Sequence, residues 1–256
     1  IYFWYMSKEQ QTTEIIRLPT AEEMLAAGIH FGHRTAKWDP KMKPYIFTTK
    51  NNVHIFDLEK TREKFKEALE FLAKTAGKGG VILLVGTSAA SKKITKDLAL
   101  ECLMPYITER WIGGTLTNFR MISKRLEHFR DLENKRASGE LKKYTKKEQH
   151  DFDQELIKLE KRFGGIKQLT KIPDALFIFN AKENDLAIRE ARRAGVKIAA
   201  LCDTNMNPDM IDYPIPANDD ALAGLELMAK YIEGIIKENK RNAIRLEKTP
   251  SAEQRK

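Results

Sequence analysis

The sequence predicts an α/β protein: a doubly wound, mostly parallel sheet flanked by helices, with an inserted antiparallel coiled-coil helical hairpin. Two observations predict the sheet. Short runs of consecutive apolar residues, such as 81–85, are typical of strands covered on both faces, and amphipathic helical segments separate them. This alternation favours a doubly wound parallel sheet. A third observation, narrow apolar seams in the highly charged stretch 117–163, predicts the hairpin.

The elements of the α/β domain follow one another along the chain. Strands are predicted at 81–85, 175–179, 196–201 and 213–215, and helices at 59–76, 89–102, 184–194 and 218–240. Before them the chain is rich in glycine and proline, and only two short elements are predicted there. One is a helical turn near 20–27, with Thr20 as N-cap and Glu23 as its capping-box partner. The other is a strand hairpin at 45–56 that turns at the Asn-Asn pair 51–52.

The stretch 117–163 predicts two antiparallel helices joined near the polar segment 138–140. Their apolar residues recur at spacings of three and four, which gives each helix one narrow seam. The seams consist of Phe119, Ile122, Leu126 and Phe129 on the first helix, and Phe152, Leu156, Leu159 and Phe163 on the second. The charged outer faces are either simply solvated or reach a partner.

The predicted domain organisation has four parts. Residues 1–19 form an N-terminal extension, in which residues 1–5 are expected to be foreign to the native chain or an addition to it; 20–116 with 164–236 form the α/β domain; 117–163 is the hairpin; and 237–256 is a basic helix end with a frayed tail.

Composition narrows the class of protein. The chain has 256 residues and a formal net charge of +9, and 32% of its residues are charged, where about 25% is usual. A hydrophobic fraction of 42% argues against disorder, and two cysteines are too few for a disulfide-built secreted domain. No run approaches the roughly 18 apolar residues that cross a bilayer. We therefore expect a reducing, cytoplasmic setting, no membrane partner, and an acidic partner for the positive charge.

An enzyme that binds a nucleotide is the main alternative. The segment 86–93 follows a predicted buried strand and opens a helix, where a phosphate-binding loop would lie. However, Ser91 stands where the P-loop pattern needs glycine, and Lys93 stands where it needs serine or threonine. No nucleophile elbow is present, and Cys102 and Cys202 lie in apolar surroundings typical of core residues. We therefore predict no catalysis and no small-molecule substrate.

A metal site has only weak support. The candidate ligands are His30, His33, His54, Asp203, Asp219 and Asp220. Zinc sites usually gather histidine and cysteine in two closely spaced pairs, and the chain offers no second pair. The histidines are expected to be packed or bonded to backbone. The aspartates are expected to cap their neighbouring turns, as the position of Asp219 and Asp220 just before the last helix suggests, with a structural divalent cation as the alternative. No cofactor is predicted.

Nucleic-acid binding has the strongest support, from two segments that mix bases with aromatic residues. The first basic-aromatic block (residues 34–45) contains Arg34, Lys37, Trp38, Lys41, Lys43 and Tyr45. The second (residues 110–120) contains Arg110, Trp111, Thr117, Asn118 and Arg120 around two glycines. Basic side chains neutralise phosphates, aromatic rings stack on nucleobases, and glycines let the backbone approach a ligand. The alternative is that Trp38 and Trp111 pack on the core while the bases are solvated.

At these segments the chain resembles the family of small ribosomal subunit protein two, of bacterial or organellar type. The resemblance is carried by residues 28–47, 111–118, 173–177, 203–208 and 215–221, and covers about 20–236. It implies an α/β domain with a coiled-coil insertion, and a structural protein of the small subunit. It also implies binding to ribosomal RNA and help in seating neighbouring proteins, including ribosomal protein S-one where present.

Carried over by position, the resemblance makes nine residues of the two blocks the RNA-facing candidates: Arg34, Lys37, Trp38, Lys41, Lys43, Arg110, Trp111, Thr117 and Asn118. The chain departs from the family's usual pattern at Ser88, where a base is common, and at Ala217, where glycine is common. The first departure weakens any phosphate contact at 86–88. The expected location is a cytoplasmic ribosome, with an organellar ribosome as the alternative.

Overall fold

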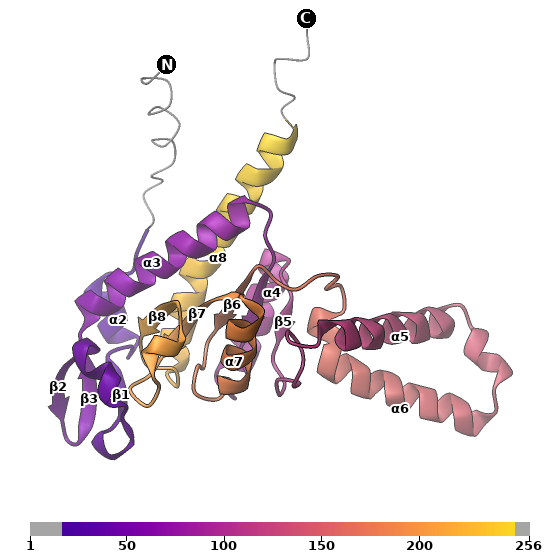
Figure 1. The fold of residues 1–256 in the computed structure, drawn as a ribbon, viewed down its shortest axis with the longest axis horizontal. Helices are drawn as coiled ribbons and strands as arrows, with labels where there is room; N and C mark the ends of the chain where they lie inside the picture. Colours follow the sequence, from indigo (N-terminus) through magenta and orange to yellow (C-terminus); the bar gives the residue numbers. More distant parts are fainter. Residues whose placement is uncertain (1–16, 249–256) are drawn as a thin grey trace, which may run out of the picture.

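The computed structural model describes residues 17–248, with the backbone alone for 243–248. The predictions made for residues 1–5 and for the tail from 249 lie outside the described residues. Within 17–248, a central parallel sheet carries helices on both faces, a small antiparallel sheet lies at one end, and a helical hairpin projects at the other (Figure 1). The predicted fold class is confirmed.

The central sheet has five parallel strands in the order β5-β4-β6-β7-β8. They are β4 Ile82–Val85, β5 Tyr106–Ile107, β6 Ala175–Ile178, β7 Lys197–Cys202 and β8 Tyr213–Pro216. Numbered along the chain, the order is 2-1-3-4-5, so the direction of winding reverses between β4 and β6. The crevice at the carboxyl ends of these two strands is where doubly wound sheets usually bind ligands. The sequence did not predict β5, because two residues carry no pattern.

Alternate strand residues point into two separate cores. Leu84 and Phe177 face the side covered by α3 Leu58–Gly77, α4 Ser91–Cys102 and α8 Leu222–Lys248. Leu83 and Ile178 face the side covered by α7 Asp185–Ala194 and by the base of the hairpin. Helices α3 and α8 run side by side across the first face (Figure 1).

The last helix is longer than predicted. It begins at Leu222 instead of 218 and continues to Lys248 instead of 240. Its basic C-terminal turns, which the sequence assigns to a separate segment, therefore prolong the same helix. None of the helices in the described part of the chain is both long and apolar enough to cross a membrane.

A three-stranded antiparallel sheet precedes the central one, in the order β1-β3-β2. Its strands are β1 Phe31–Arg34, β2 Ile46–Lys50 and β3 Val53–Phe56, with short 3-10 helices η1 Thr35–Lys37 and η2 Pro40–Tyr45 between the first two. Asn51 and Asn52 have φ angles of 51° and 60°, as a two-residue hairpin of type I′ requires. The predicted hairpin is confirmed, whereas β1 was missed.

The N-terminal helix α2 Ala21–Ala26 begins at the predicted capping box. The Glu23 amide donates to Thr20 Oγ1 at 3.1 Å, and the Thr20 amide donates to Glu23 Oε2 at 2.8 Å. These two bonds satisfy two backbone donors that the helix itself cannot pair. The sequence therefore specifies this helix start locally.

The predicted hairpin consists of α5 Phe119–Ala137 and α6 Lys146–Phe163, joined through η3 Glu140–Lys143. Figure 1 shows both helices extending away from the central sheet. Five residues of the predicted seams are buried, and the other three pack against them partly buried: Ile122, Leu126, Phe129, Leu156 and Phe163, then Phe119, Phe152 and Leu159. Cross-helix pairs His128–Glu155 (3.0 Å) and Arg136–Asp153 (3.3 Å) flank the seam. The antiparallel arrangement follows from the seams.

Candidate functional site

The first basic-aromatic block follows β1 and forms a surface segment. The side chains of Arg34, Lys37, Lys41 and Lys43 are exposed, and Lys41 pairs with Asp209. Two internal contacts fix this segment. Asp39 caps η2 by accepting the Lys41 amide at 2.9 Å, and the Asp39 amide donates to the Thr204 carbonyl at 2.7 Å. Because Met42 is completely buried below the segment, the bases around it must point outwards.

Trp38 and Tyr45 are only partly buried. The Trp38 ring packs against His54 with 5.0 Å between ring centroids, and Tyr45 packs against the core. Trp38 therefore keeps one part of its ring accessible beside exposed bases. The Trp38 ring can therefore contact a nucleobase or a ribose.

The second block divides into a buried and an exposed part. Trp111 is 6% exposed and belongs to the core on the α7 face, so its ring cannot stack on a base. The burial of Trp111 fits the alternative reading of the sequence, in which this ring packs on the core. Arg110, Thr117, Asn118 and Arg120 are exposed. The structure thus keeps four of the five candidates of this block on the surface.

Glu190 of α7 holds the 113–118 loop that carries Thr117 and Asn118. Its carboxylate accepts the backbone amides of Gly114 at 2.7 Å, Leu116 at 3.0 Å and Thr117 at 3.3 Å. Sequence reasoning missed Glu190 because it lies among charged residues. One signal was available: Glu190 is three residues after Ala187 and one before Ala191, which places it on the apolar face of α7.

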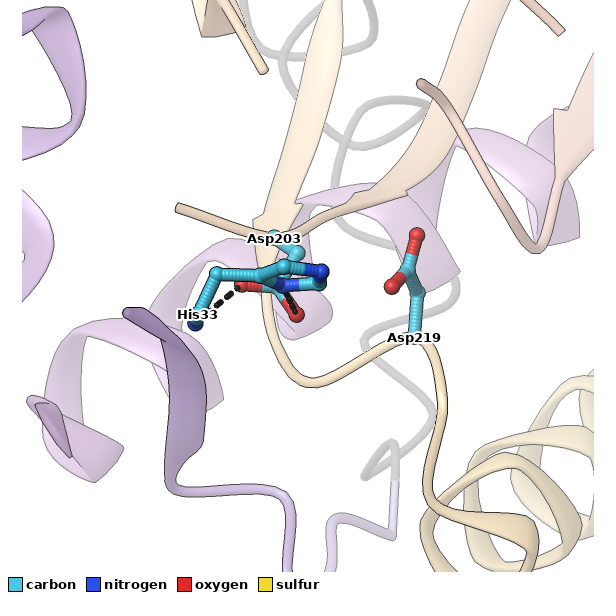
Figure 2. A group of neighbouring side chains, drawn as sticks. All are labelled: His33, Asp203 and Asp219. Carbon is cyan, nitrogen blue, oxygen red and sulfur yellow. Dashed lines mark hydrogen bonds and ion pairs between the residues drawn. The ribbon is translucent and has the colours of Figure 1, made fainter. Parts of the chain in front are cut away.

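A polar cluster lies where β1 meets the carboxyl edge of the central sheet (Figure 2). It consists of His33, Asp203 and Asp219, each of which offers one ligand atom within 4.8 Å of the others. His33 Nδ1 lies 2.9 Å from Asp203 Oδ2, and the His33 amide donates to Asp203 Oδ1 at 3.2 Å. Asp203 and Asp219 are 1% and 6% exposed. The cluster therefore joins the small sheet to the end of β7 and to the segment before α8.

Burial and mutual repulsion shift the protonation of this cluster. Burial, reinforced by the charges of Asp203 and Asp220, raises the pKa of Asp219 to about 8. The hydrogen bond with Asp203 raises the pKa of His33 above its usual value against the opposing effect of burial. Near neutral pH a protonated Asp219 keeps the buried charge of the cluster small. An imidazole and two carboxylates are also a donor set that suits a divalent cation.

Two sequence-based expectations about these residues were wrong. His33 is not merely packed, since its ring pairs with a carboxylate 170 positions away. Asp219 does not cap the last helix but points into the cluster. The turn before α8 is instead shaped by Asn218, whose Oδ1 accepts the Asp220 amide at 3.0 Å. Asp220 is outside the cluster, with its carboxylate 3.9 Å from His33 Nε2.

The crevice between β4 and β6 is filled by the protein's own polar groups. Ser91 Oγ donates to Asn180 Oδ1 at 2.5 Å, and Asn180 Nδ2 donates to the Asp219 carbonyl at 2.9 Å. A Cβ added at Gly86 would lie 2.0 Å from Thr95 Oγ1, so the strand end packs directly on α4. The turn that the sequence offered as a nucleotide site is therefore closed by internal hydrogen bonds and packing.

Comparison with known proteins identifies the family. The sequence profile of ribosomal protein S2 matches residues 24–239, a span that contains both blocks and the polar cluster. The chain belongs to the ribosomal protein S2 family. This family is structural and not enzymatic, so the prediction that the chain is not an enzyme is confirmed.

Several S2 proteins of bacteria are similar to the chain over most of its length. Each is called small ribosomal subunit protein uS2. The protein of Roseiflexus sp. (strain RS-1) is 45% identical over 84% of this chain and 82% of its own length. The protein of Chloroflexus aurantiacus is 42% identical over 86% and 93%, and that of Fusobacterium nucleatum subsp. nucleatum is 44% identical over 85% and 88%. The family resemblance seen in the sequence is confirmed, and it is of bacterial type.

Proposed function

We propose that the protein is a structural constituent of the small ribosomal subunit that binds ribosomal RNA and helps to seat neighbouring ribosomal proteins, including S-one where present. The observation that carries the first part is the similarity to small-subunit uS2 proteins over 82–93% of their length. Those relatives are bacterial, which supports a ribosome in the cytoplasm. RNA binding is supported by the placement of exposed bases, argued below.

The first block is the main proposed RNA contact. Its four bases are exposed on a segment anchored by Met42 and by the Asp39–Thr204 hydrogen bond. A rigid segment that carries exposed bases can neutralise several phosphates without losing much conformational freedom on binding. Trp38 adds an accessible ring surface at the centre of the block.

The second block provides a different chemistry. Thr117 and Asn118 are exposed hydrogen-bonding side chains at the start of α5, with Arg110 and Arg120 as exposed bases near them in the chain. Hydroxyl, amide and guanidinium groups bond phosphate oxygens and ribose hydroxyls. We therefore assign RNA contact to these four residues and not to Trp111.

Incorporation into the small subunit tests the proposed RNA surface. Trp38→Ala and Lys41→Glu should both reduce the amount of protein that is incorporated into purified subunits. Lys66→Glu is the matched charge-reversal control, because Lys66 is an equally exposed lysine on α3, away from both blocks. The site assignment fails if the block variants are incorporated as fully as the control.

The hairpin is the proposed contact with neighbouring ribosomal proteins. On α6, Ile157 is 59% exposed and lies among charged residues beside the apolar seam. Exposed apolar residues surrounded by charges are typical of protein contacts. Ile157→Asp should lower the content of a neighbouring protein in purified subunits, as measured by quantitative mass spectrometry. Leu222→Asp, equally exposed on α8, is the control. Unchanged content of every neighbour in the Ile157 variant would remove this assignment.

A second candidate function is binding of a structural divalent cation by the polar cluster. The observation that favours it is the convergence of one imidazole nitrogen and two buried carboxylates within 4.8 Å. Calorimetric titration with Zn²⁺ should show one site that Asp203→Asn abolishes. Asp220→Asn should retain it, because Asp220 lies outside the cluster. Equal Zn²⁺ binding by both variants would refute the assignment.

A further inference from the structure

Glu190 is a buried acid that accepts hydrogen bonds from three backbone amides of the 113–118 loop. Its residue is 5% exposed, and it accepts the amides of Gly114, Leu116 and Thr117. None of the ion pairs within residues 17–248 includes it. Burial raises the pKa of Glu190, but hydrogen bonds from the three amides and from the Trp111 side chain outweigh burial, so its pKa lies below the usual value. The side chain is therefore ionised, and its charge is compensated by the loop itself.

This arrangement gives the 113–118 loop a fixed shape. Gly114 has a φ of +90°, and the Asn118 amide donates to the Gly114 carbonyl at 2.9 Å, so the loop closes on itself just before α5. Leu116 is buried at 2% exposure within the same core as Trp111. Without a central acceptor, the amides of Gly114, Leu116 and Thr117 would point at one another across a partly buried space. Unpaired buried donors are costly, so the loop would open.

The last residue with a held amide, Thr117, and the next residue, Asn118, are both exposed. Thr117 donates its amide to Glu190 while its side chain faces solvent, and Asn118 begins α5 with no cap bond made by its own side chain. The Asn118 side chain is therefore free to bond a ligand. Its direction is set by the backbone that Glu190 holds.

We propose that Glu190 is a positioning residue for RNA recognition: it orients Thr117 and Asn118 by fixing the 113–118 loop through three amide hydrogen bonds. The inference rests on the proposed function, in which those two side chains contact ribosomal RNA. Glu190 itself touches no RNA, because it is buried beneath the loop. A role in stability alone would make the protein easier to unfold without changing the RNA affinity of the folded protein.

Four variants of the full-length protein separate these roles. Glu190→Gln keeps the size of the side chain but has one acceptor oxygen and an NH₂ group that cannot accept, so at least one loop amide loses its partner. Gly114→Ala disturbs the loop from the other side, since alanine is strained at φ +90° and its Cβ would lie 3.3 Å from Asn118 Cβ. Asn118→Ala removes a proposed contact directly. Glu226→Gln, an exposed acid on α8, is the charge control.

Two measurements are made on each variant below its unfolding temperature. Hydrogen exchange reports the amides of Gly114, Leu116 and Thr117, and a filter-binding titration with protein-free small-subunit ribosomal RNA reports affinity. We expect Glu190→Gln and Gly114→Ala to speed the exchange of these amides at least tenfold and to weaken RNA binding about tenfold. Adding Glu190→Gln to the double variant Thr117→Ala, Asn118→Ala should weaken binding by no more than about a further twofold, because Glu190 acts through these two side chains.

The outcomes distinguish this inference from the proposed function. If Asn118→Ala weakens binding but Glu190→Gln does not, the RNA surface stands and the positioning role of Glu190 is refuted. If neither variant weakens binding, the RNA contact of this loop fails, and the role of Glu190 in RNA recognition fails with it. If the loss caused by Glu190→Gln simply adds to that of the double variant Thr117→Ala, Asn118→Ala, Glu190 acts elsewhere and the inference is overturned. Only faster loop exchange together with a non-additive loss of affinity supports it.

Discussion

The imidazole of His33 and the carboxylate of Asp203 meet at 2.9 Å although they are 170 positions apart in the chain. His33 lies in β1 and Asp203 directly follows β7, so the pair joins the small antiparallel sheet to the central sheet. The Asp39–Thr204 backbone bond reinforces the same junction. The segment with the first basic block starts directly after His33, which means that this junction sets its orientation.

The free energy of unfolding should fall as a rise in pH removes the protons of His33 and Asp219 in the polar cluster. The folded-state pKa of Asp219 is raised to about 8 and that of His33 is raised above its usual value. A group whose pKa is higher in the folded than in the unfolded protein binds its proton more tightly when the protein is folded. Its contribution to the free energy of unfolding is therefore complete below the unfolded-state pKa and is lost above the folded-state pKa. For Asp219 the loss extends from about pH 4 to about pH 8, and for His33 it begins near pH 6.5.

Thermal unfolding of the metal-free protein, measured in EDTA, checks this sign. The wild-type Tm should decrease between pH 5 and pH 9. The Tm of Asp219→Asn should decrease less, because asparagine removes the titration of Asp219, which is the larger of the two. A Tm that depends on pH equally in the wild type and in Asp219→Asn would contradict the raised pKa of Asp219.

The two tryptophans of the blocks should behave in opposite ways. Trp111 is 6% exposed in the core, so Trp111→Ala should destabilise the protein by about 3–5 kcal/mol, the usual cost of removing a large buried ring. Trp38 is only partly buried, so Trp38→Ala should cost less stability and more RNA affinity. Urea unfolding and RNA titration of both variants measure this contrast. Equal losses of stability would contradict the burial difference.

Local patterns were sufficient to predict most of the fold. The Thr20–Glu23 capping box, the Asn-Asn turn at 51–52 and the seams of the hairpin are each encoded within a few residues, and each was found where the sequence placed it. Strands β1 and β5 were missed because they are short and depend on pairing with distant segments. The last residue of α8 was placed too early, at 240, because the basic helix end that follows is charged and lacks the apolar spacing that marks a helix face.

The candidate site was predictable only in part, because burial is a tertiary property. In sequence, Trp38 and Trp111 are both tryptophans beside basic residues, yet only Trp111 is buried in the core on the α7 face of the sheet. The polar cluster combines residues from three distant segments, and no local spacing marks it. Glu190 was overlooked for the same reason, since its three amide partners lie more than 70 positions away.

Leu103 should be a site where a smaller residue stabilises the protein. It ends α4 in the left-handed conformation with a φ of 51° and is 81% exposed, so its side chain gains little from packing. Leu103→Gly should therefore raise the free energy of unfolding by about 1 kcal/mol, because glycine adopts this conformation without strain. Leu100→Gly, three residues earlier and also exposed, should lower it by about 1 kcal/mol, since it lies inside the helix. Urea unfolding measures both, and destabilisation by Leu103→Gly would mean that the exposed leucine makes a favourable contact.

The salt dependence of RNA binding should identify which exposed bases contact phosphates. Each phosphate contact releases condensed counterions, so removing one base should reduce the slope of log affinity against log salt by about 1. Lys43→Gln and Arg120→Gln are expected to do so, because both residues are exposed within the two blocks. Asn118→Ala should weaken binding without changing the slope, because an uncharged side chain displaces no counterion.

Filter binding to small-subunit ribosomal RNA from 50 to 200 mM salt measures the slopes, with Lys66→Gln as the control. Equal slopes for Lys43→Gln, Arg120→Gln and the control would show that the positive charge of the two blocks serves only to solvate the surface.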